Sequence, residues 1–404
     1  MKPVGLYPTH GPARDIPGIP ASCRDQAWER SRFEWRVGDP GDPAALVESF
    51  LTRHNLIVND VSACCTSSEV PDREHDICGA ALFVSAAGGA AMAGGRQGAP
   101  SPVPSVPDVV AVVYAHSATV RPQGEPDAPS GQTHGDWRLG AWRPSWSPAD
   151  HAAAVEQVRA SIARGDVYQV NVVGHASAGY TGDPLPALRR LTRLPGARYA
   201  GILSGDGWAI GCGSPETLLR VRGGEVLTRP IKGTAPATAA GRAELLASPK
   251  ERAEHVMIVD LMRNDLSHVA VTGTVRVPRL FALRPWCDLW QAESDVTARI
   301  RPGTGLAELL RAVCPGGSVT GAPKLAALAE IARLEPVGRG VSMGALGWIG
   351  PDSIDLGLTI RTAAVDGTSV HVWAGGGITI DSDPWAEVAE AAAKAAPVRT
   401  ALHS

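Results

Sequence analysis

The sequence predicts an α+β fold in which large antiparallel sheets pack as a sandwich and are flanked by helices. In the later two thirds of the chain, several strand-like runs follow one another directly, as on either side of the turn at Gly223-Gly224. Successive parallel strands would need a crossover helix between them. The direct succession of strands therefore favours antiparallel sheets over a doubly wound parallel sheet.

Length and composition are those of an ordinary globular protein. The chain has 404 residues, 44% of them hydrophobic and 20% charged, and a formal net charge of −3. This balance favours neither nucleic acid nor a membrane as a partner. No apolar run approaches the ~18 residues that span a bilayer, and the N-terminus lacks the apolar core of a signal peptide. The seven cysteines form no Cys-x-x-Cys pair, so we expect reduced thiols in the cytoplasm, with neither a disulfide framework nor a zinc site.

The elements are predicted unevenly along the chain. In the partly loop-rich front region, 1–146, only 44–51 resembles a helix and only 109–114 a buried strand. From Ser147-Pro148, a good N-cap and first helical residue, helices are expected at 148–164, 239–247, 249–264, 306–313 and 322–334. Strands are expected at 166–173, 207–221, 224–228, 344–349, 353–365 and 369–373. Asp383-Pro384 is expected to cap a last helix that ends near residue 396.

One lysine stands out in the stretch Arg229-Pro230-Ile231-Lys232-Gly233-Thr234, which follows a strand-like run and breaks at a glycine. A lone lysine beside a turn is most often a surface amine. An amine held in a pocket behaves differently, because desolvation lowers its pKa and frees a lone pair for nucleophilic attack. The remaining motifs of the chain decide between these two interpretations.

Two pairs of glutamates lie early in predicted helices with the same spacing: Glu251 with Glu254, and Glu387 with Glu390. Residues three apart share a helix face. Taken alone, Glu251 fits a capping box with Ser248, which would be purely structural. If the pairs converge, their carboxylates suit Mg²⁺, which keeps several waters and binds anionic substrates.

Three further features could receive an anion. The small-residue loop 316–324 enters a helix and offers backbone amides, although it lacks the Gly-Lys-Ser/Thr order of a nucleotide P-loop. The glycines 375–377 follow a strand and allow close approach, but a bare glycine run is more often a bulge or turn. Arg361 lies in a strand whose other residues look buried, where it needs an anionic partner such as a carboxylate. Asn264-Asp265, by contrast, is expected to be structural.

Taken together, these motifs resemble the chorismate-utilising enzymes, the family of anthranilate, isochorismate, salicylate and aminodeoxychorismate synthases. The resemblance covers roughly 147–397 and is carried by the motifs at 165–171, 213–216, 229–234, 251–265, 317–324 and 374–390. It implies that 147–397 is the chorismate-binding catalytic region of the family's sandwich fold. Residues 1–146 are then expected to contribute to the sandwich, and 398–404 to be a tail.

Within the family, the position of Lys232 is the most informative. Anthranilate and isochorismate synthases look like Pro-(Ile/Leu)-Ala-Gly-Thr here, whereas aminodeoxychorismate synthases look like Pro-Ile-Lys-Gly-Thr. The resemblance therefore implies amination of chorismate at ring carbon 4 through a covalent Lys232 adduct, with Glu216 as the general acid for the departing hydroxyl. Gln169 stands where isochorismate-forming relatives carry a lysine that activates water, which argues against water as the nucleophile.

The same resemblance implies a cofactor and a partner. Mg²⁺ would be held directly by Glu254 and Glu390, and directly or through water by Glu251 and Glu387. The chorismate site would comprise Gln169, Thr234, Thr320, Gly321, Lys324, Arg361, Gly375, Gly376 and Gly377, with the substrate carboxylates received by Arg361, Lys324 and the glycine amides. No cysteine has the Gly-Cys-x-Gly setting of a glutamine amidotransferase, so ammonia is expected from a separate amidotransferase subunit.

Two motifs depart from the family pattern. Relatives commonly show His-Leu-Val-Ser where this chain has Gln291-Ala292-Glu293-Ser294, and Arg-Gly-x-Tyr-x-Gly where it has 339–344 with Ser342 in place of Tyr. Both replaced residues line the substrate pocket in relatives. Gln291 and Ser342 therefore suggest a catalytically silent binding subunit as one alternative. Another chorismate chemistry in the same pocket, chiefly anthranilate formation, is a second alternative, against which Lys232 and Gln169 argue.

Overall fold

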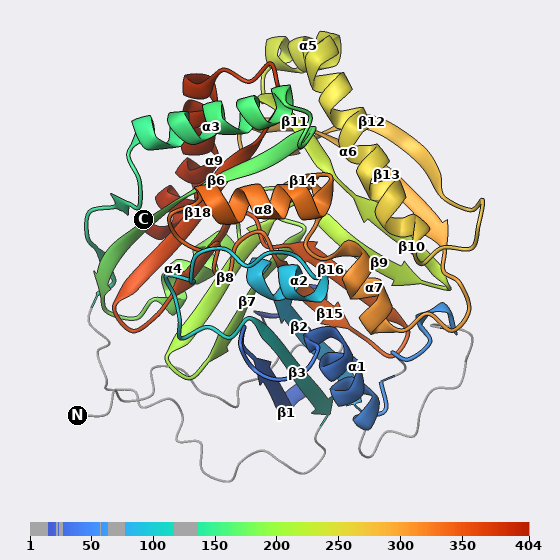
Figure 1. The fold of residues 1–404 in the computed structure, drawn as a ribbon. Coiled ribbons are helices and arrows are strands. Elements are labelled where there is room, and N and C mark those ends of the chain that lie inside the picture. The colour runs from blue at the N-terminus through green and yellow to red at the C-terminus, as the bar shows by residue number, and fades with distance from the viewer. Residues whose placement is uncertain are drawn as a thin grey trace.

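The computed structural model describes residues 15–21, 23, 27–56, 58–63, 77–116 and 136–403, and its strands form two antiparallel sheets (Figure 1). Ten strands form the larger sheet. In spatial order they are β1 (Ala27–Trp35), β3 (Val109–His116), β2 (Ile77–Val84), β15 (Ala345–Ile349), β16 (Ser353–Leu358), β9 (Thr217–Arg222), β10 (Glu225–Arg229), β13 (Leu289–Arg299) and β11 (Ile231–Pro236), with β12 (Arg276–Trp286) also paired to β13. Because β2 pairs with β15, the front region belongs to this sheet and adds three of its strands.

The smaller sheet has eight strands. In spatial order they are β14 (Gly321–Ala322), β6 (Gln169–Thr181), β18 (Ser369–Ile378), β17 (Thr362–Val365), β8 (Trp208–Ser214) and β7 (Tyr199–Gly205), with β4 (Arg138–Leu139) and β5 (Arg143–Pro144) paired to β6. The two antiparallel sheets and the helices around them confirm the predicted α+β fold.

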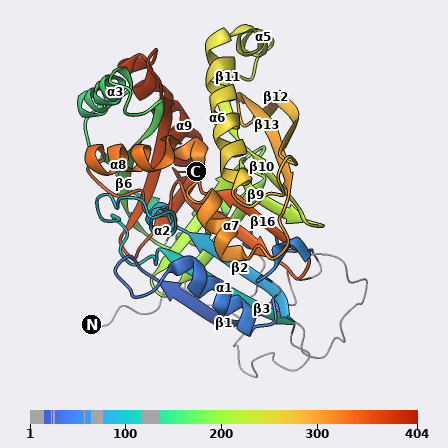
Figure 2. The same ribbon diagram turned by 45° about the vertical axis from the view of Figure 1, so that its right-hand side comes forward.

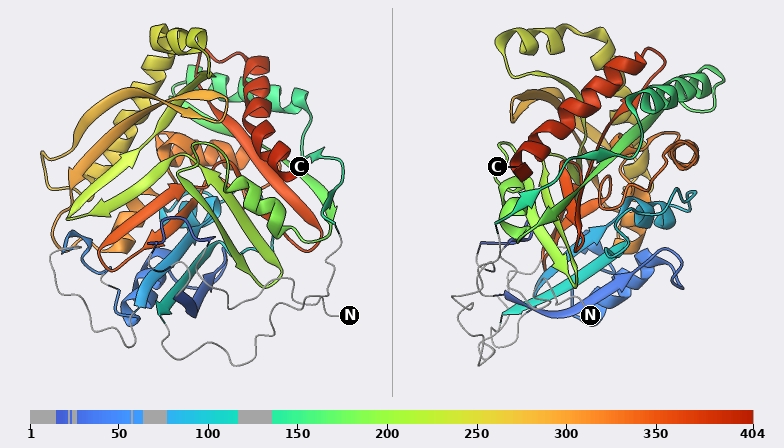
Figure 3. Two further views of the ribbon diagram at one scale, coloured as in Figure 1. Left: turned by 180° about the vertical axis from the view of Figure 1, so that it is seen from behind. Right: turned by 90° about the vertical axis from the view of Figure 1, so that its left-hand side faces the viewer.

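Helices flank both sheets. They are α1 (Pro43–Arg53), α2 (Ala86–Met92), α3 (Pro148–Ala163), α4 (Leu185–Leu191), α5 (Ala239–Ala247), α6 (Pro249–Ser267), α7 (Leu306–Val313), α8 (Lys324–Leu334) and α9 (Pro384–His403), with short 3₁₀ turns η2 (Val61–Ala63) and η3 (Gly317–Val319). In Figure 1, α1, α2, α7 and α8 lie in front of the strands, whereas from behind the strands face the viewer over much of the molecule (Figure 3). Within the described part of the chain, no helix is long and apolar enough to cross a membrane.

The helix starts follow the signals in the sequence. The Ser147 hydroxyl accepts a hydrogen bond from the Asp150 amide at 3.1 Å, and that of Ser248 accepts from the Glu251 amide at 3.2 Å. Asp383 likewise accepts from the amide two residues on, at 3.0 Å. The last helix, however, continues to His403, so 398–403 belong to α9 and are not the tail that the sequence indicates.

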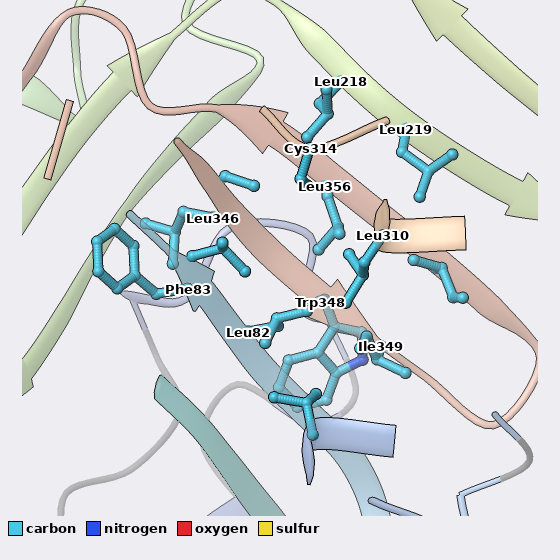
Figure 4. Packing of buried hydrophobic residues seen from close by; sticks show 14 of the residues in the cluster. Leu82, Phe83, Leu218, Leu219, Leu310, Cys314, Leu346, Trp348, Ile349 and Leu356 are labelled. Atoms are coloured by element: carbon cyan, nitrogen blue, oxygen red, sulfur yellow. The ribbon is translucent and has the colours of Figure 1, made fainter. Parts of the chain in front are cut away.

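The main core packs α1, α2 and α7 against the centre of the larger sheet. Figure 4 shows Leu82 and Phe83 of β2 beside Leu346 and Trp348 of β15, with Leu310 of α7 over them. Strand β2 is buried on both faces, so it lacks the alternation of apolar and polar residues that marks a half-buried strand. Its small residues are typical of a loop, so the sequence does not predict this strand.

Two runs that the sequence predicts as single strands are each split between the sheets. Residues 207–221 form β8 and β9, and 353–365 form β16 and β17, so the chain changes sheet at Glu216 and again at Arg361. The two crossings lie side by side, because the Leu358 amide donates to the Glu216 carbonyl at 3.0 Å and the Gly213 amide to the Arg361 carbonyl at 3.1 Å. Arg361 thus lies between strands and not within one as expected, with a left-handed φ of 52°.

Candidate active site

A cavity of about 850 Å³, partly open to solvent, lies where β11 and β18 meet α6 and α9. In Figure 2, α6 stands on one side of this region and α3 with α9 on the other. The predicted site residues that line it are Glu216, Lys232, Thr234, Glu251, Glu254, Arg361, Gly375, Gly376, Gly377, Glu387 and Glu390.

Lys232 points into this cavity from the start of β11, with 18% of its side chain exposed. Its Nζ lies 2.8 Å from Oε2 of Glu254 and donates to the Gly377 carbonyl at 3.2 Å. Burial lowers the pKa of the ammonium, but the carboxylates of Glu254, Glu390 and Glu387 outweigh it, and the net pKa is raised. The expectation of a lowered pKa is therefore wrong for this arrangement of charges, in which Lys232 is an ammonium group.

The backbone of Lys232 is held by a buried pair on the other side of β11. Nδ1 of His255 in α6 lies 2.9 Å from the Lys232 carbonyl oxygen, and its Nε2 lies 2.5 Å from the Ser294 hydroxyl. The Lys232 carbonyl can only accept, so Nδ1 carries the proton, and burial lowers the pKa of His255, so that Nε2 of the neutral ring accepts from the Ser294 hydroxyl, which itself accepts from the Phe281 amide at 2.9 Å. The adjacent Gly233 has a φ of 96°, and a Cβ there would lie 2.9 Å from Oε2 of Glu251.

All four predicted glutamates reach the cavity, two from α6 and two from α9. Thr379 donates to Oε1 of Glu254 at 3.0 Å, and Ser382 donates to Oε1 of Glu387 at 2.7 Å. Burial is the main cause that raises the pKa of Glu251 and of Glu387, and the neighbouring glutamates add to it. Their negative charge is thus incompletely compensated by the side chains around them.

Glu390, like Glu254, has a lysine as its ion-pair partner. It pairs with Lys394 one helical turn on, which lowers the pKa of the Glu390 carboxyl. The Nζ of Lys394 also donates to the Gly375 carbonyl at 3.2 Å. Lys394 was not among the residues predicted from sequence, although a lysine four residues after Glu390 in a helix indicates an ion pair.

Glu216 lies at the back of the cavity and is only 3% exposed. The Ser318 hydroxyl donates to its Oε1 at 2.5 Å. Burial raises the pKa of Glu216 to about 7, against the opposing effect of the Ser318 hydrogen bond. A carboxyl group with this pKa can hold and release a proton near neutral pH.

Arg361 is a buried cation that faces the cavity. Its guanidinium carbon lies 4.6 Å from the centre of the Trp286 ring, and Nη1 donates to the Lys394 carbonyl at 3.3 Å. Among the described residues, no carboxylate lies within ion-pair distance of it and its Nε has no hydrogen-bond partner. Burial lowers its pKa to about 10. This side chain is arranged for an anion that enters the cavity.

The glycines 375–377 lie within β18, paired with β6, and do not follow a strand as expected. A Cβ at Gly377 would lie 2.5 Å from Nε2 of Gln169 and 3.2 Å from Nζ of Lys232. A side chain at this position would therefore occupy the space between Gln169 and Lys232. Gln169 itself is fully buried, and neither polar atom of its amide has a partner in the described part of the chain.

Four predicted residues do not line the cavity: Gln169, which is buried behind Gly377, and Thr320, Gly321 and Lys324. The Nζ of Lys324 lies 2.8 Å from Oδ2 of Asp265 and donates to the Ala312 carbonyl at 3.1 Å, so it ties α8 to α6 and α7. The role of Lys324 as a carboxylate receptor is thus not supported, whereas the structural role expected for Asp265 fits. Thr320 bonds to the Gly316 carbonyl at 2.9 Å, and Gly321 pairs with Val170 of β6.

The two departures from the family pattern have different places. Gln291 lines the cavity, so the replacement of His bears directly on it. Ser342 donates to the Thr359 carbonyl at 3.2 Å, and the neighbouring Met343 reaches the cavity instead. Asn171 and Ser318 also line it, and both belong to motifs that the sequence singled out without assigning these residues a role.

The chorismate-binding enzyme family matches residues 106–400, and the chain belongs to this family. Aminodeoxychorismate synthase component 1 of Klebsiella aerogenes is 41% identical over 257 residues, which are 62% of this chain and 57% of that protein. Anthranilate synthase component 1 of Streptomyces coelicolor is 37% identical over 311 residues, which are 74% of this chain and 61% of that protein. The match therefore spans less than two thirds of the length of these curated relatives.

Solved structures give the same fold. The crystal structure of anthranilate synthase component I from Streptococcus pneumoniae superimposes with a TM-score of 0.75 at 25% identity, covering 92% of this chain and 91% of that one. An isochorismate synthase described as 2,3-dihydroxybenzoate-specific, from Bacillus anthracis, superimposes with a TM-score of 0.68 at 19% identity, covering 99% of this chain and 97% of that one.

Proposed function

We propose that this chain aminates chorismate at ring carbon 4 to give 4-amino-4-deoxychorismate, the precursor of 4-aminobenzoate. The observation that carries the proposal is Lys232, an amine in the wall of the cavity beside Glu254 and β18. The resemblance implies a lysine at this position in aminodeoxychorismate synthases. Relatives of that name are among the most similar proteins.

In the first step, the Lys232 ammonium group gives up a proton to solvent, and the resulting neutral amine forms a bond to ring carbon 2. The ring double bonds shift, the bond between carbon 4 and its hydroxyl breaks, and Glu216 protonates the departing oxygen so that it leaves as water. The covalent adduct divides the replacement of the hydroxyl, a poor leaving group, by ammonia into two easier steps. Glu216 is suited to this role because burial raises its pKa to about 7.

In the second step, ammonia forms a bond to ring carbon 4. The double bonds shift back, and the bond between carbon 2 and Nζ breaks with its electron pair returning to Lys232. The product ammonium group gives a proton to the Glu216 carboxylate, which restores the acid. The sum of the two steps replaces a hydroxyl by an amino group and releases one water.

The donor set fits Mg²⁺, which would be held by Glu254 and Glu390 directly and by Glu251 and Glu387 directly or through water. Oxygen donors suit this ion, and the raised pKa values of Glu251 and Glu387 indicate carboxylate charge that a cation would compensate. When bound, Mg²⁺ supplies charge neutralisation for a substrate carboxylate and helps to orient the ring. The other carboxylate of chorismate would be received by Arg361, which has no carboxylate partner among the described residues.

Anthranilate formation is the second candidate, because anthranilate synthases are nearly as similar to this chain. Lys232 speaks against it, and the retention of Lys232, Glu216 and the four glutamates speaks against a silent binding subunit. The ammonia would come from a separate glutamine amidotransferase subunit.

The covalent step can be tested directly. Incubation with chorismate and Mg²⁺ in the absence of ammonia should add the mass of chorismate less one water to the intact protein, and peptide mapping should place the addition on Lys232. Lys232→Arg, which keeps a cation beside Glu254, should show no addition. Unmodified wild-type protein under conditions that support turnover with ammonia would contradict the covalent mechanism.

A further inference from the structure

Three metal-binding side chains from distant parts of the sequence meet at the N-terminal edge of the larger sheet. They are Cys23, Cys78 and His116, whose ligand atoms all lie within 4.8 Å of one another. The two cysteines are buried and the histidine is half-buried. None of the three lines the candidate active site.

The fold aims each of these side chains at the same point. His116 ends β3 and pairs with Ala27 of β1, and the Ala27 amide donates to the Cys23 carbonyl at 3.0 Å, which fixes Cys23 beside it. In β2, Ile77 pairs with Ala115 but Gly79 pairs with Tyr114, so Cys78 is the extra residue of a β-bulge. A bulge re-aims a side chain that regular pairing would direct elsewhere.

One donor–donor distance suits a tetrahedral metal ion, whose fourth position the three side chains would leave to a water molecule or another ligand. Sγ of Cys23 lies 3.6 Å from Nε2 of His116. With typical metal–ligand lengths for zinc, about 2.3 Å to sulfur and about 2.0 Å to nitrogen, two ligands at a tetrahedral angle lie about 3.6 Å apart. The same distance also fits a weak thiol–imidazole hydrogen bond, and the experiment below separates the two.

Charge and donor chemistry specify the ion. Two thiolates and a neutral imidazole neutralise one divalent cation, so the loaded site would add no net charge to a buried place. Sulfur donors select Zn²⁺ over Mg²⁺, whereas the glutamates of the active site have the opposite preference. The sulfur donors would therefore bind Zn²⁺, and the glutamate oxygens of the active site would bind Mg²⁺.

We propose that Cys23, Cys78 and His116 bind a structural Zn²⁺ ion. The ion would fasten Cys23, and with it the described segment 15–21, to the edges of β2 and β3. This segment carries the buried Ile16 and Ile19, and it covers β7 so closely that a Cβ at Gly201 would lie 2.4 Å from the Asp15 carbonyl oxygen. The expectation from sequence that the chain has no zinc site rested on the absence of a Cys-x-x-Cys pair, and the fold supplies the donors without one.

The test is the metal content of the full chain, purified under reducing conditions without a histidine tag. We expect about one zinc per chain, and a thiolate-to-metal charge-transfer band when zinc is replaced by Co²⁺. Cys23→Ser, Cys78→Ser and His116→Ala should lose both signals. His116→Cys should keep both, because it preserves the number of donors and guards against a variant that merely fails to fold.

Two controls define the site. Cys287→Ser removes a cysteine from the turn between β12 and β13 and should leave zinc and the cobalt band unchanged. The double variant Glu254→Gln, Glu390→Gln alters the active site and should also keep them. A wild-type protein with less than a tenth of one zinc per chain and no cobalt–thiolate band would overturn the proposal. A band that survives in Cys23→Ser and Cys78→Ser, or a Cys23–Cys78 disulfide in the purified protein, would overturn it as well.

Discussion

The Nζ of Lys232 lies 2.8 Å from Oε2 of Glu254, so the proposed nucleophile forms an ion pair with a proposed metal ligand. An ammonium group has no lone pair and does not attack carbon. A cation held by Glu254 would take over the carboxylate that now stabilises the charge of Lys232. One glutamate would therefore link metal binding to the nucleophilicity of the lysine.

Replacement of Lys232 by alanine should abolish amination while leaving chorismate binding intact. The nucleophile is lost, but Arg361 and the metal ligands remain, so we expect the turnover rate to fall by at least about 10³-fold and the dissociation constant to change by less than about threefold. Turnover is measured with saturating ammonium and binding by calorimetry. Lys232→Arg should be equally inactive, and wild-type rates in either variant would refute the nucleophile.

The double variant Glu254→Gln, Glu390→Gln should lose both activity and its dependence on Mg²⁺. Neutral amides are weaker ligands for a hard divalent cation, so added Mg²⁺ should no longer raise turnover. The matched control is Glu156→Gln, whose exposed carboxylate pairs with Arg159 on the surface and should keep the wild-type response. Full Mg²⁺-stimulated turnover in the double variant would show that the metal lies elsewhere.

Glu216 should impose an alkaline limb on kcat/KM. Its pKa is raised to about 7 and the proposed role needs the protonated form, so ionisation of Glu216 should lower the rate about tenfold per pH unit above pH 7 relative to the profile of Glu216→Gln, while the need for the neutral amine of Lys232 acts in the opposite direction. Ser318→Ala should move the limb to higher pH, because the Ser318 hydrogen bond lowers the pKa of Glu216. Glu216→Gln should reduce the rate by about 10²- to 10⁴-fold and remove the limb. A limb unchanged in Glu216→Gln would assign it to another group.

Arg361→Met should weaken chorismate binding and raise the free energy of unfolding. The buried guanidinium has no carboxylate partner in the described structure and its pKa is lowered to about 10, so its removal should raise the free energy of unfolding by about 1–3 kcal/mol. Chorismate binding should weaken by at least about 100-fold through loss of a charge-assisted contact. Denaturant unfolding and calorimetry measure the two effects. A destabilised variant that binds chorismate normally would mean that Arg361 serves the fold alone.

Local signals made the helices readable from sequence. Ser147, Ser248 and Asp383 cap helices that the structure contains, and α7 has the predicted bounds. Strands were harder. β1 acquires its form from β3, a partner far away in the chain, whereas β12 and β13 pair with each other across the turn at Cys287-Asp288 and were still missed. The sheet changes at Glu216 and Arg361 fall where Ser214-Pro215-Glu216 and 359–362 interrupt the apolar runs, but such an interruption does not reveal that the chain passes to the other sheet.

The site shows the same division. Lys232 and the glutamates were found because their motifs are contiguous, and the structure brings them to one cavity. Lys324 was misplaced because its loop suits an anion, while the side chain turns to Asp265, a partner that only the tertiary structure reveals. The raised pKa of Lys232 also depends on three carboxylates whose convergence was not visible along the chain.

The identity of the product tests the central claim most directly. The purified protein is incubated with chorismate, Mg²⁺ and a high concentration of ammonium, and the product is identified by mass and chromatography. We predict 4-amino-4-deoxychorismate, which an added lyase converts to 4-aminobenzoate. Anthranilate or isochorismate as the product, or bound chorismate without turnover, would contradict amination through Lys232.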